Sequence, residues 1–205
     1  MRESGALPHV TLRAILGTEI MEAAIDRIYR VFRVGLHWIV GYGAAIIMLG
    51  GTGLAILEII RRYVFGSVYN WGQDAVTFFI AGSVFLFFAV TQARRSHLAM
   101  TALLETLRDR GYVRTVLALR AFISAVSLAF FATFAWWGTD AVAQTFARGR
   151  VTQSMVFYVW PFQLCLAVGF ALMAVATIFH LYQDVQALRG KTVFPWAPVE
   201  EGLDI

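Results

Sequence analysis

Residues 71–92 read WGQDAVTFFIAGSVFLFFAVTQ, and this stretch decides the class of fold. After Asp74 it contains no further charged residue. An α-helix needs about 20 mostly apolar residues to cross the hydrocarbon core of a bilayer. Three other runs have the same character, at residues 34–57, 115–138 and 156–181. The sequence therefore predicts an all-α integral membrane protein with four transmembrane helices in a single membrane domain of 205 residues.

The composition supports a membrane protein and argues against other classes. Apolar residues make up 59% of the chain and charged residues 15%, whereas soluble domains have about 45–50% and about 25%. The high pI of the chain could suggest binding to nucleic acid. The basic residues lie between the apolar runs, however, which favours a membrane protein, so nucleic acid is not an expected partner. A single cysteine, Cys165, excludes an intrachain disulfide and a cysteine-based metal cluster within one chain. We expect neither an enzyme nor a bound cofactor.

The distribution of basic residues predicts the orientation of the helices. Thirteen of the 17 Arg and Lys residues fall before the first run, between the second run and the start of the third (Arg120 included), or after the fourth. Connections rich in Arg and Lys stay on the cytoplasmic side of the membrane. We therefore expect both termini to be cytoplasmic, in a prokaryotic inner membrane.

Segments outside the four runs are amphipathic or polar. Within residues 1–33, the apolar side chains Met21, Ile25, Ile28 and Phe32 recur at helical spacing, which predicts a helix that lies along the cytoplasmic membrane surface. Residues 97–110 have a similar pattern. The two readings of these helices are a solvated linker, or contact with lipid or a partner protein. Residues 191–205 are expected to form a flexible tail.

The ionisable residues of the four runs lie near the helix ends. A transporter that works alone usually has carboxylates or broken helices at the bilayer midplane, and ionisable groups buried there are functional candidates. This chain has almost none at that depth. The sequence therefore argues against a self-sufficient transporter.

Three candidate contact residues lie at the predicted outer boundary. Arg61 and Arg62 follow the first run and could bind lipid phosphates or pair with Asp74. Asp74 opens the second run, where Asn70 could cap the helix and a carboxylate favours the positive helix end. The alternative for Asp74 is a polar contact with a partner subunit.

The other candidate contact residues are Trp71, Gly82 and His97. Trp71 belongs to the expected outer aromatic belt. Gly82 lies in a seven-residue repeat of small residues with Ala75 and Ala89, which allows close helix packing in lipid and is a candidate contact with a partner. His97 lies close after two arginines in the connection between the second and third runs. There, a surface histidine is a simpler interpretation than a histidine that binds a ligand.

Two histidines define an alternative function. His37 and His180 lie at the predicted inner ends of the first and fourth runs, and a pair of histidines in a four-helix membrane bundle can bind haem. The chain would then be a membrane redox anchor. An unrelated four-span assembly or lipid-handling protein is the third possibility.

Several motifs resemble a known family. RYVF at residues 62–65, WGQD at 71–74 opening a helix, and RRSHLAM at 94–100 resemble the DctQ-like small membrane subunit of tripartite ATP-independent periplasmic (TRAP) transporters. VTQSM at 151–155 before Pro161, and FHLY at 179–182, fit the same family. The resemblance covers most of residues 30–185. The family often has Glu at the position of Asp74, which keeps the charge.

The resemblance implies a function that the residues alone do not show. In this family the small subunit accompanies a large membrane subunit, the M-type subunit, which carries the substrate and sodium sites. A periplasmic substrate-binding protein delivers an organic acid. The small subunit would be a scaffold that widens the static part of the transporter and contacts membrane lipids. An ion gradient would drive import, and the chain accordingly has no P-loop.

Overall fold

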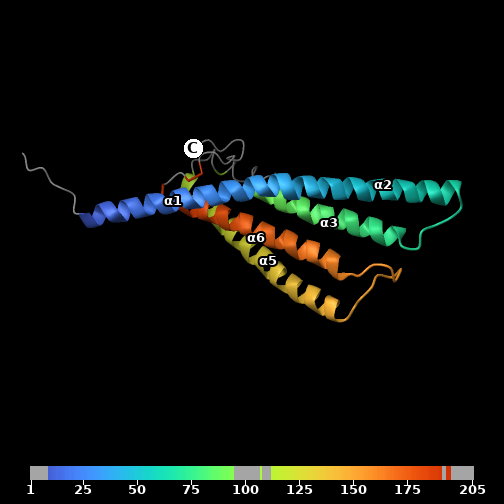
Figure 1. Ribbon diagram of the computed structural model, residues 1–205. Helices are drawn as coiled ribbons and strands as arrows, with labels where there is room; N and C mark the ends of the chain where they lie inside the picture. The colour runs from blue at the N-terminus through green and yellow to red at the C-terminus, as the bar shows by residue number, and fades with distance from the viewer. Residues whose placement is uncertain (1–8, 95–106, 108–111, 191–192, 195–205) are drawn as a thin grey trace, which may run out of the picture.

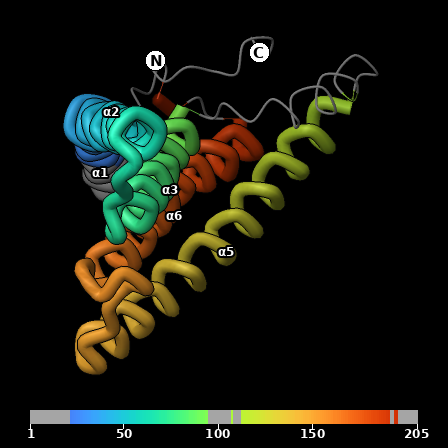
Figure 2. Tube along the Cα trace, turned by 90° about the vertical axis from the view of Figure 1, so that its right-hand side faces the viewer, coloured from blue at the N-terminus to red at the C-terminus, as the bar shows by residue number. Residues whose placement is uncertain are grey.

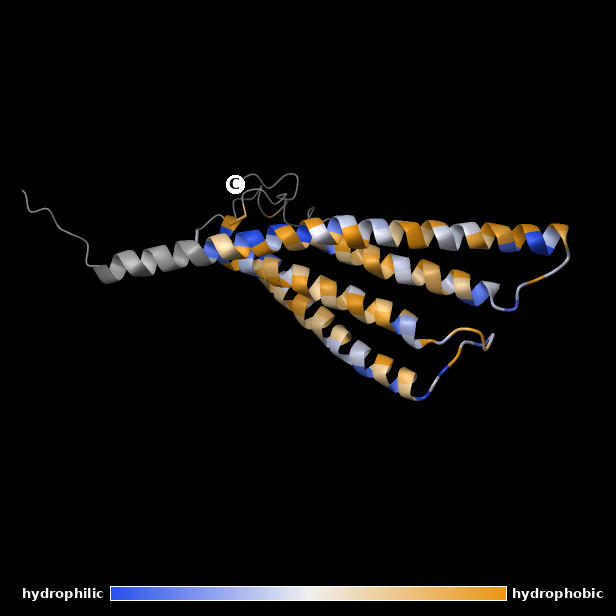
Figure 3. Cartoon of the chain, viewed as in Figure 1, coloured by the Kyte–Doolittle hydropathy of each residue, from blue (hydrophilic) through white to orange (hydrophobic). Residues whose placement is uncertain are grey.

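The computed structural model describes residues 9–94, 107, 112–190 and 193–194. The chain forms α1 (His9–Gly35), a short π-helix η1 (Leu36–Gly41), α2 (Tyr42–Val64), α3 (Gly72–Ala93), α5 (Val113–Ala147) and α6 (Trp160–Leu188). Four helical segments are long and apolar enough to cross a membrane. The hydropathy colouring shows apolar residues along each of them (Figure 3). The prediction of an all-α protein with four transmembrane helices is confirmed over the described residues.

The four spans form a row and not a closed bundle. α3 packs between α2 and α6, and α5 packs on the other side of α6. In the view of Figure 1 the helices draw together toward one end, which we call the convergent end, where α1 and residues 193–194 lie. Figure 2 shows that α5 is set apart from α1 and α2 at this end. At the other end, which we call the splayed end, the α2–α3 and α5–α6 connections lie. Because the row is open, α2 and α5 each have only one neighbouring span.

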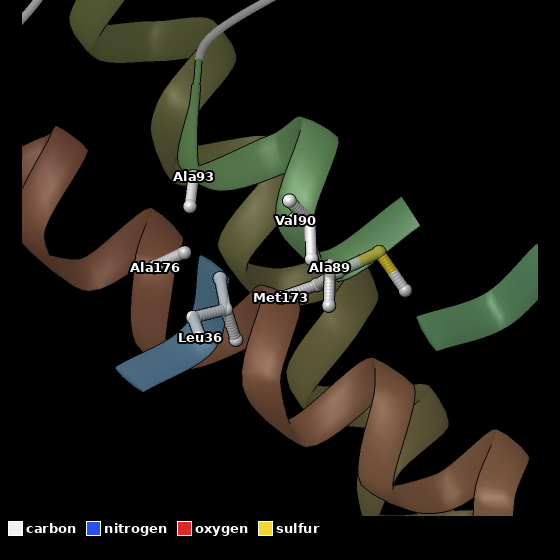
Figure 4. Packing of buried hydrophobic residues seen from close by; sticks show 6 residues of the cluster. All are labelled: Leu36, Ala89, Val90, Ala93, Met173 and Ala176. Carbon is white, nitrogen blue, oxygen red and sulfur yellow. The ribbon is translucent and has the colours of Figure 1, made fainter. Parts of the chain in front are cut away.

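Small side chains and a compact apolar cluster hold the convergent end together. Its core combines residues of η1, α3 and α6, shown in Figure 4: Leu36, Ala89, Val90, Ala93, Met173 and Ala176. All six are buried, and three of them are alanines, because small residues let helix backbones approach closely. The seven-residue repeat of the second run is thus an internal packing surface, since Ala75 and Ala89 are buried.

A glycine lies at a close approach in each of the three seams of the row: Gly51 between α2 and α3, Gly169 between α3 and α6, and Gly138 between α5 and α6. The tightest backbone contact is at Gly169. A Cβ atom there would lie 3.0 Å from the backbone oxygen of Phe85, which cannot move without a shift of the helix. Glycine therefore sets the spacing of the central pair of helices.

The first helix continues into the first span without a turn. α1, η1 and α2 follow one another directly, and Figure 1 shows α1 extending the line of α2 beyond the row. The helix predicted within residues 1–33 is thus continuous with the first span, and its position along the membrane surface stays a prediction. A π-helical segment inserts one extra residue into a turn and re-aims the side chains on either side of it. It turns the buried face of α1 onto the convergent end without interrupting the helix.

The buried face of α1 includes Ile25 and Phe32 of the predicted stripe, but Tyr29 takes the place of Ile28. Tyr29 is 2% exposed, whereas Ile28 is 60% exposed. Tyr29 packs on Phe179 of α6 and on Phe194, with ring centroids 4.6 and 4.9 Å apart. The prediction of a flexible tail from residue 191 is therefore wrong for Val193 and Phe194, which belong to this cluster. Residues 195–205 and the predicted helix at 97–110, Leu107 apart, lie outside the described residues.

The helix boundaries differ from the predicted runs at both ends of the row; at the convergent end, α6 continues to Leu188, past residue 181. α3 matches residues 71–92 to within one residue. α2 continues to Val64 and α5 to Ala147, past the apolar runs that ended at residues 57 and 138. α6 begins at Trp160 and not at 156, with Pro161 in its first turn, where a proline is compatible with a helix. Apolar content marks the lipid-facing part of a helix and not its hydrogen-bonded length.

Candidate interaction surfaces and polar contacts

Arg61 organises the α2–α3 connection. Its Nε atom donates a hydrogen bond to the hydroxyl oxygen of Ser67 at 3.0 Å, and its guanidinium lies 3.9 Å from the centre of the Tyr69 ring. A cation over an aromatic face is attracted by the ring quadrupole. Arg61 therefore contacts its own connection. It does not pair with Asp74, which was one of the two interpretations of the sequence. Arg62 is exposed beside it.

Asp74 and Trp71 connect the two loops of the splayed end. The backbone N–H of Ser154 donates to Asp74 Oδ2 at 3.1 Å, and the Trp71 ring meets Phe157 edge-on at 5.8 Å between centroids. Both contacts join the start of α3 to the α5–α6 connection. The expected cap from Asn70 is absent, because Trp71 is the N-cap and makes no side-chain cap hydrogen bond. Asp74 thus fastens the start of α3 to the α5–α6 connection, and its contact with a partner subunit stays a prediction.

A polar groove of about 540 Å³ lies where the two connections meet. Asp74 and Ser154 line it, together with the polar side chains of Asn70, Gln73, Thr77 and Gln153. A second groove of about 700 Å³, on the side of α2, is mostly apolar and includes Arg61 and Tyr69. The splayed end therefore presents one polar and one apolar hollow on neighbouring faces.

Gly82 lies in a seam within this chain. A Cβ atom at Gly82 would lie 3.8 Å from the Cβ atom of Cys165 on α6, which is ordinary contact. A large side chain there would push α3 away from α6. The structure thus places Gly82 at an internal contact, whereas the sequence offered it as a candidate contact with a partner. The sixth candidate, His97, lies outside the described residues.

A buried ion pair between α5 and α6 was missed by the sequence analysis. Arg120 Nε lies 3.7 Å from Asp184 Oδ1, and the Asp184 side chain is 4% exposed. Ser124, one turn after Arg120, donates to Asp184 Oδ2 at 2.5 Å. In the sequence, the one sign of this ion pair is that Asp184 is an isolated acidic residue, four residues after His180, at the end of an apolar run. Pairing it required knowing that α5 and α6 are neighbours.

A second buried polar contact joins α3 to α6. Gln92 Nε2 donates to Thr177 Oγ1 at 3.1 Å, and that hydroxyl donates in turn to the backbone oxygen of Met173 at 2.8 Å. Interhelical hydrogen bonds of this kind contribute about 0.6 kcal/mol each on average in membrane proteins. Together with the Arg120–Asp184 pair, this contact gives each seam of α6 one polar link near the convergent end.

The two histidines of the haem alternative have different surroundings. His37, in η1, is exposed and its Nδ1 atom lies 2.9 Å from Arg94 Nη2. His180 is 3% exposed and its ring meets Tyr29 edge-on. A haem with two histidine ligands needs both rings to face one shared cavity. The contacts of these two rings lie on different elements, so the geometry gives no support to the redox-anchor interpretation.

The edge helices expose continuous apolar stripes. On α5 the exposed large side chains recur every three or four residues: Phe122, Val126, Phe130, Phe134 and Trp137. On α2 a similar stripe runs along the whole span: Tyr42, Ile46, Leu49, Ile56 and Ile60. Large exposed apolar patches mark contacts with lipid or with another protein. Both free edges of the row are therefore suited to an apolar partner or to acyl chains.

These features define a multi-pass, all-helical membrane protein whose polar contacts hold its own helices together. The family model for the DctQ component of tripartite ATP-independent periplasmic transporters matches residues 51–187. The chain therefore belongs to the DctQ family and is a small-subunit component of a TRAP transporter. No curated protein and no solved structure gives a significant match to it. The resemblance drawn from the sequence motifs is confirmed.

Proposed function

We propose that this chain is the scaffold subunit of a sodium-coupled TRAP importer for an organic acid. It would hold the large M-type transport subunit in the inner membrane, and a periplasmic binding protein would deliver the substrate to the complex. Family membership supports the place of the chain in such a complex. Sodium coupling and an organic acid substrate are carried over from the family resemblance of the sequence.

The open row of four spans is the observation that carries the scaffold role. A closed bundle would bury the apolar faces of its helices against one another, whereas α2 and α5 each contact one span. A row is wide in the membrane plane and offers a long edge for docking. It can therefore enlarge the static part of a transporter against which another domain moves.

The placement of charged groups is consistent with a subunit that does not itself carry substrate. The acidic residues of α2, α3, α5 and α6 are Glu58, Asp74, Asp140 and Asp184. Asp74 bonds to a loop, and Asp184 is held by Arg120 and Ser124. The carboxylates of Asp74 and Asp184 thus already hold parts of the chain together. Substrate and ion binding would then belong to the large subunit.

Reconstitution tests the transport role directly. Three sets of vesicles contain this chain alone, the large subunit alone, or both. The binding protein and a labelled carboxylate are added outside the vesicles, and a sodium gradient is imposed. Uptake is expected only when both membrane subunits are present. Uptake by this chain alone would contradict the proposal, and full uptake by the large subunit alone would remove the need for a scaffold.

Site-directed cross-linking tests the docking role. Cys165 is the one cysteine of the chain, so Cys165→Ala provides a background for single new cysteines. Leu49→Cys on α2 and Phe130→Cys on α5 probe the two exposed edges, and Ala89→Cys, which is fully buried, is the control. A cross-link to the large subunit is expected from at least one edge and not from Ala89. No cross-link from either edge would contradict docking through the row's edges.

A further inference from the structure

A groove at the convergent end combines a cation with an apolar floor. It has a volume of about 270 Å³ and lies between η1, α2 and α3. His37 and Arg94 lie at its polar part, and Gly41, Ala45, Phe87 and Val90 supply most of its apolar wall. None of the residues that line it is acidic. An anion with an attached hydrocarbon chain matches both halves of this groove.

The polar part of the groove is held in a defined arrangement. Arg94 follows the last turn of α3, and its Nη2 atom donates to His37 Nδ1 at 2.9 Å. A guanidinium has five N–H donors and only donates, so four remain beyond this bond. Because Nδ1 accepts, the imidazole carries its proton on Nε2, which adds a further donor. Among the described residues, no carboxylate forms an ion pair with Arg94.

The backbone of η1 explains why the groove is open. π-helical segments inside α-helices are frequent at functional sites, and this one brings Leu36 into the core while His37 faces Arg94. Gly41 closes the segment, and a Cβ atom there would still lie 3.8 Å from Val90. The small residues Gly41 and Ala45 thus leave room along the helix where larger side chains would fill the groove.

We infer that this groove binds one anionic phospholipid, with its phosphate on Arg94 and His37 and one acyl chain along Ala45 and Val90. Basic pockets between transmembrane helices bind lipid head groups in this way. An anionic head group fits better than a zwitterionic one, because the lining offers no carboxylate for a head-group ammonium. The lipid would fill the space between η1, α2 and α3 and fasten the first helix to the row.

The test uses the full chain, purified in mild detergent, stripped of lipid and then supplied with dioleoylphosphatidylglycerol. Native mass spectrometry measures the lipid that remains bound, and thermal unfolding measures the stabilisation. Arg94→Gln is expected to lower retention about fivefold, the effect of one arginine near a lipid phosphate. The matched control is Arg62→Gln, which removes an exposed arginine at the splayed end and is expected to leave retention unchanged.

A second variant tests the apolar half of the groove while Arg94 stays in place. Ala45→Leu fills the groove and is expected to reduce retention, whereas Ala81→Leu, at an exposed position of α3, is not. Circular dichroism and gel filtration establish that each variant is folded. Equal retention by the wild type, Arg94→Gln and Ala45→Leu would overturn the proposal.

Different ligands separate a lipid site from a simple anion site. Inorganic phosphate and glycerol 3-phosphate are expected to give no thermal stabilisation, because they lack the chain that occupies the groove. Dioleoylphosphatidylcholine is expected to bind more weakly than phosphatidylglycerol. Stabilisation by phosphate alone, or equal binding of both lipids, would contradict the proposal. Loss of the lipid when the large subunit is bound would show that a protein occupies the groove instead.

Discussion

Ser124 of α5 and Asp184 of α6 are joined by a hydrogen bond of 2.5 Å in the buried seam between their helices. The same carboxylate lies 3.7 Å from the Arg120 guanidinium. A buried charge is tolerated when its partners satisfy it, and breaking such a pair leaves the other charge uncompensated. This seam therefore depends on a polar contact that a purely apolar helix pair would not need.

Replacing Asp184 is expected to destabilise the fold strongly. Asp184→Ala leaves Arg120 buried without its carboxylate, and removing one partner of a buried pair costs about 3–5 kcal/mol. Asp184→Asn keeps an oxygen that accepts from Ser124 and is expected to cost less. Thermal unfolding in detergent measures both, with the exposed Asp140→Asn on α5 as the control. Equal midpoints for Asp184→Ala and Asp140→Asn would show that the pair is unimportant.

Adding a methyl group at Gly169 is expected to disturb the central seam of the row. In Gly169→Ala the new Cβ atom would lie 3.0 Å from the backbone oxygen of Phe85, so α3 and α6 must separate. Overpacking typically costs about 1–3 kcal/mol. Gly50→Ala is the control, because nothing lies within 4 Å of a Cβ atom there. Thermal midpoints that fall equally in both variants, or in neither, would contradict this reading of the seam.

Asp74 is expected to protect the α5–α6 connection from proteolysis. Without the carboxylate, the N–H of Ser154 loses its acceptor and the loop is freer to open. Trypsin can cut after the exposed Arg150 in this loop, so Asp74→Ala is expected to be cut faster than the wild type. Asp74→Asn retains an acceptor oxygen and should lie between the two.

The control for this experiment is Asp140→Ala, which removes an exposed acid from α5 at the same end of the row. Cleavage is followed by gel electrophoresis and mass spectrometry of the fragments. If Asp140→Ala and Asp74→Ala are cut at the same rate, the loss of negative charge is responsible and not the bond to Ser154.

The sequence contained enough information for the helices but not for their arrangement. The run at residues 71–92 identifies α3 to within one residue, because length and apolar content are local properties. The contacts that define the row are not local: Asp74 and Ser154 are 80 residues apart, and Ser124 and Asp184 are 60 apart. No periodicity within one segment reports which segment lies beside it.

The same distinction explains the interpretation of Gly82. A repeat of small residues predicts that something packs closely against that face of the helix, and Ala75 and Ala89 are indeed buried. The repeat does not say whether the neighbour is another span of the chain or another subunit. In the structure the neighbour is α6, through Cys165. Gly82→Leu is therefore a test of internal packing and not of partner binding.

The last prediction distinguishes the two possible buried faces of α1. The sequence placed Ile28 in the apolar stripe, whereas the structure buries Tyr29 against Phe179 and Phe194. Tyr29→Ala removes a buried aromatic ring, and such changes cost about 3–5 kcal/mol when the ring is fully packed. The packing free energy is lost at the contact between α1 and the end of α6. We therefore expect α1 to separate from the row before the spans unfold.

Hydrogen–deuterium exchange measures this separation one segment at a time. Faster exchange is expected in α1 and at residues 193–194 in Tyr29→Ala, with α3 unchanged, because α3 is held by its own seams. Ile28→Ala is the matched control on the adjacent, 60% exposed position and is expected to leave exchange as in the wild type. If Ile28→Ala accelerates exchange and Tyr29→Ala does not, the helix packs through the face that the sequence pattern first indicated. The comparison of Tyr29→Ala with Ile28→Ala thus identifies which face of α1 is buried.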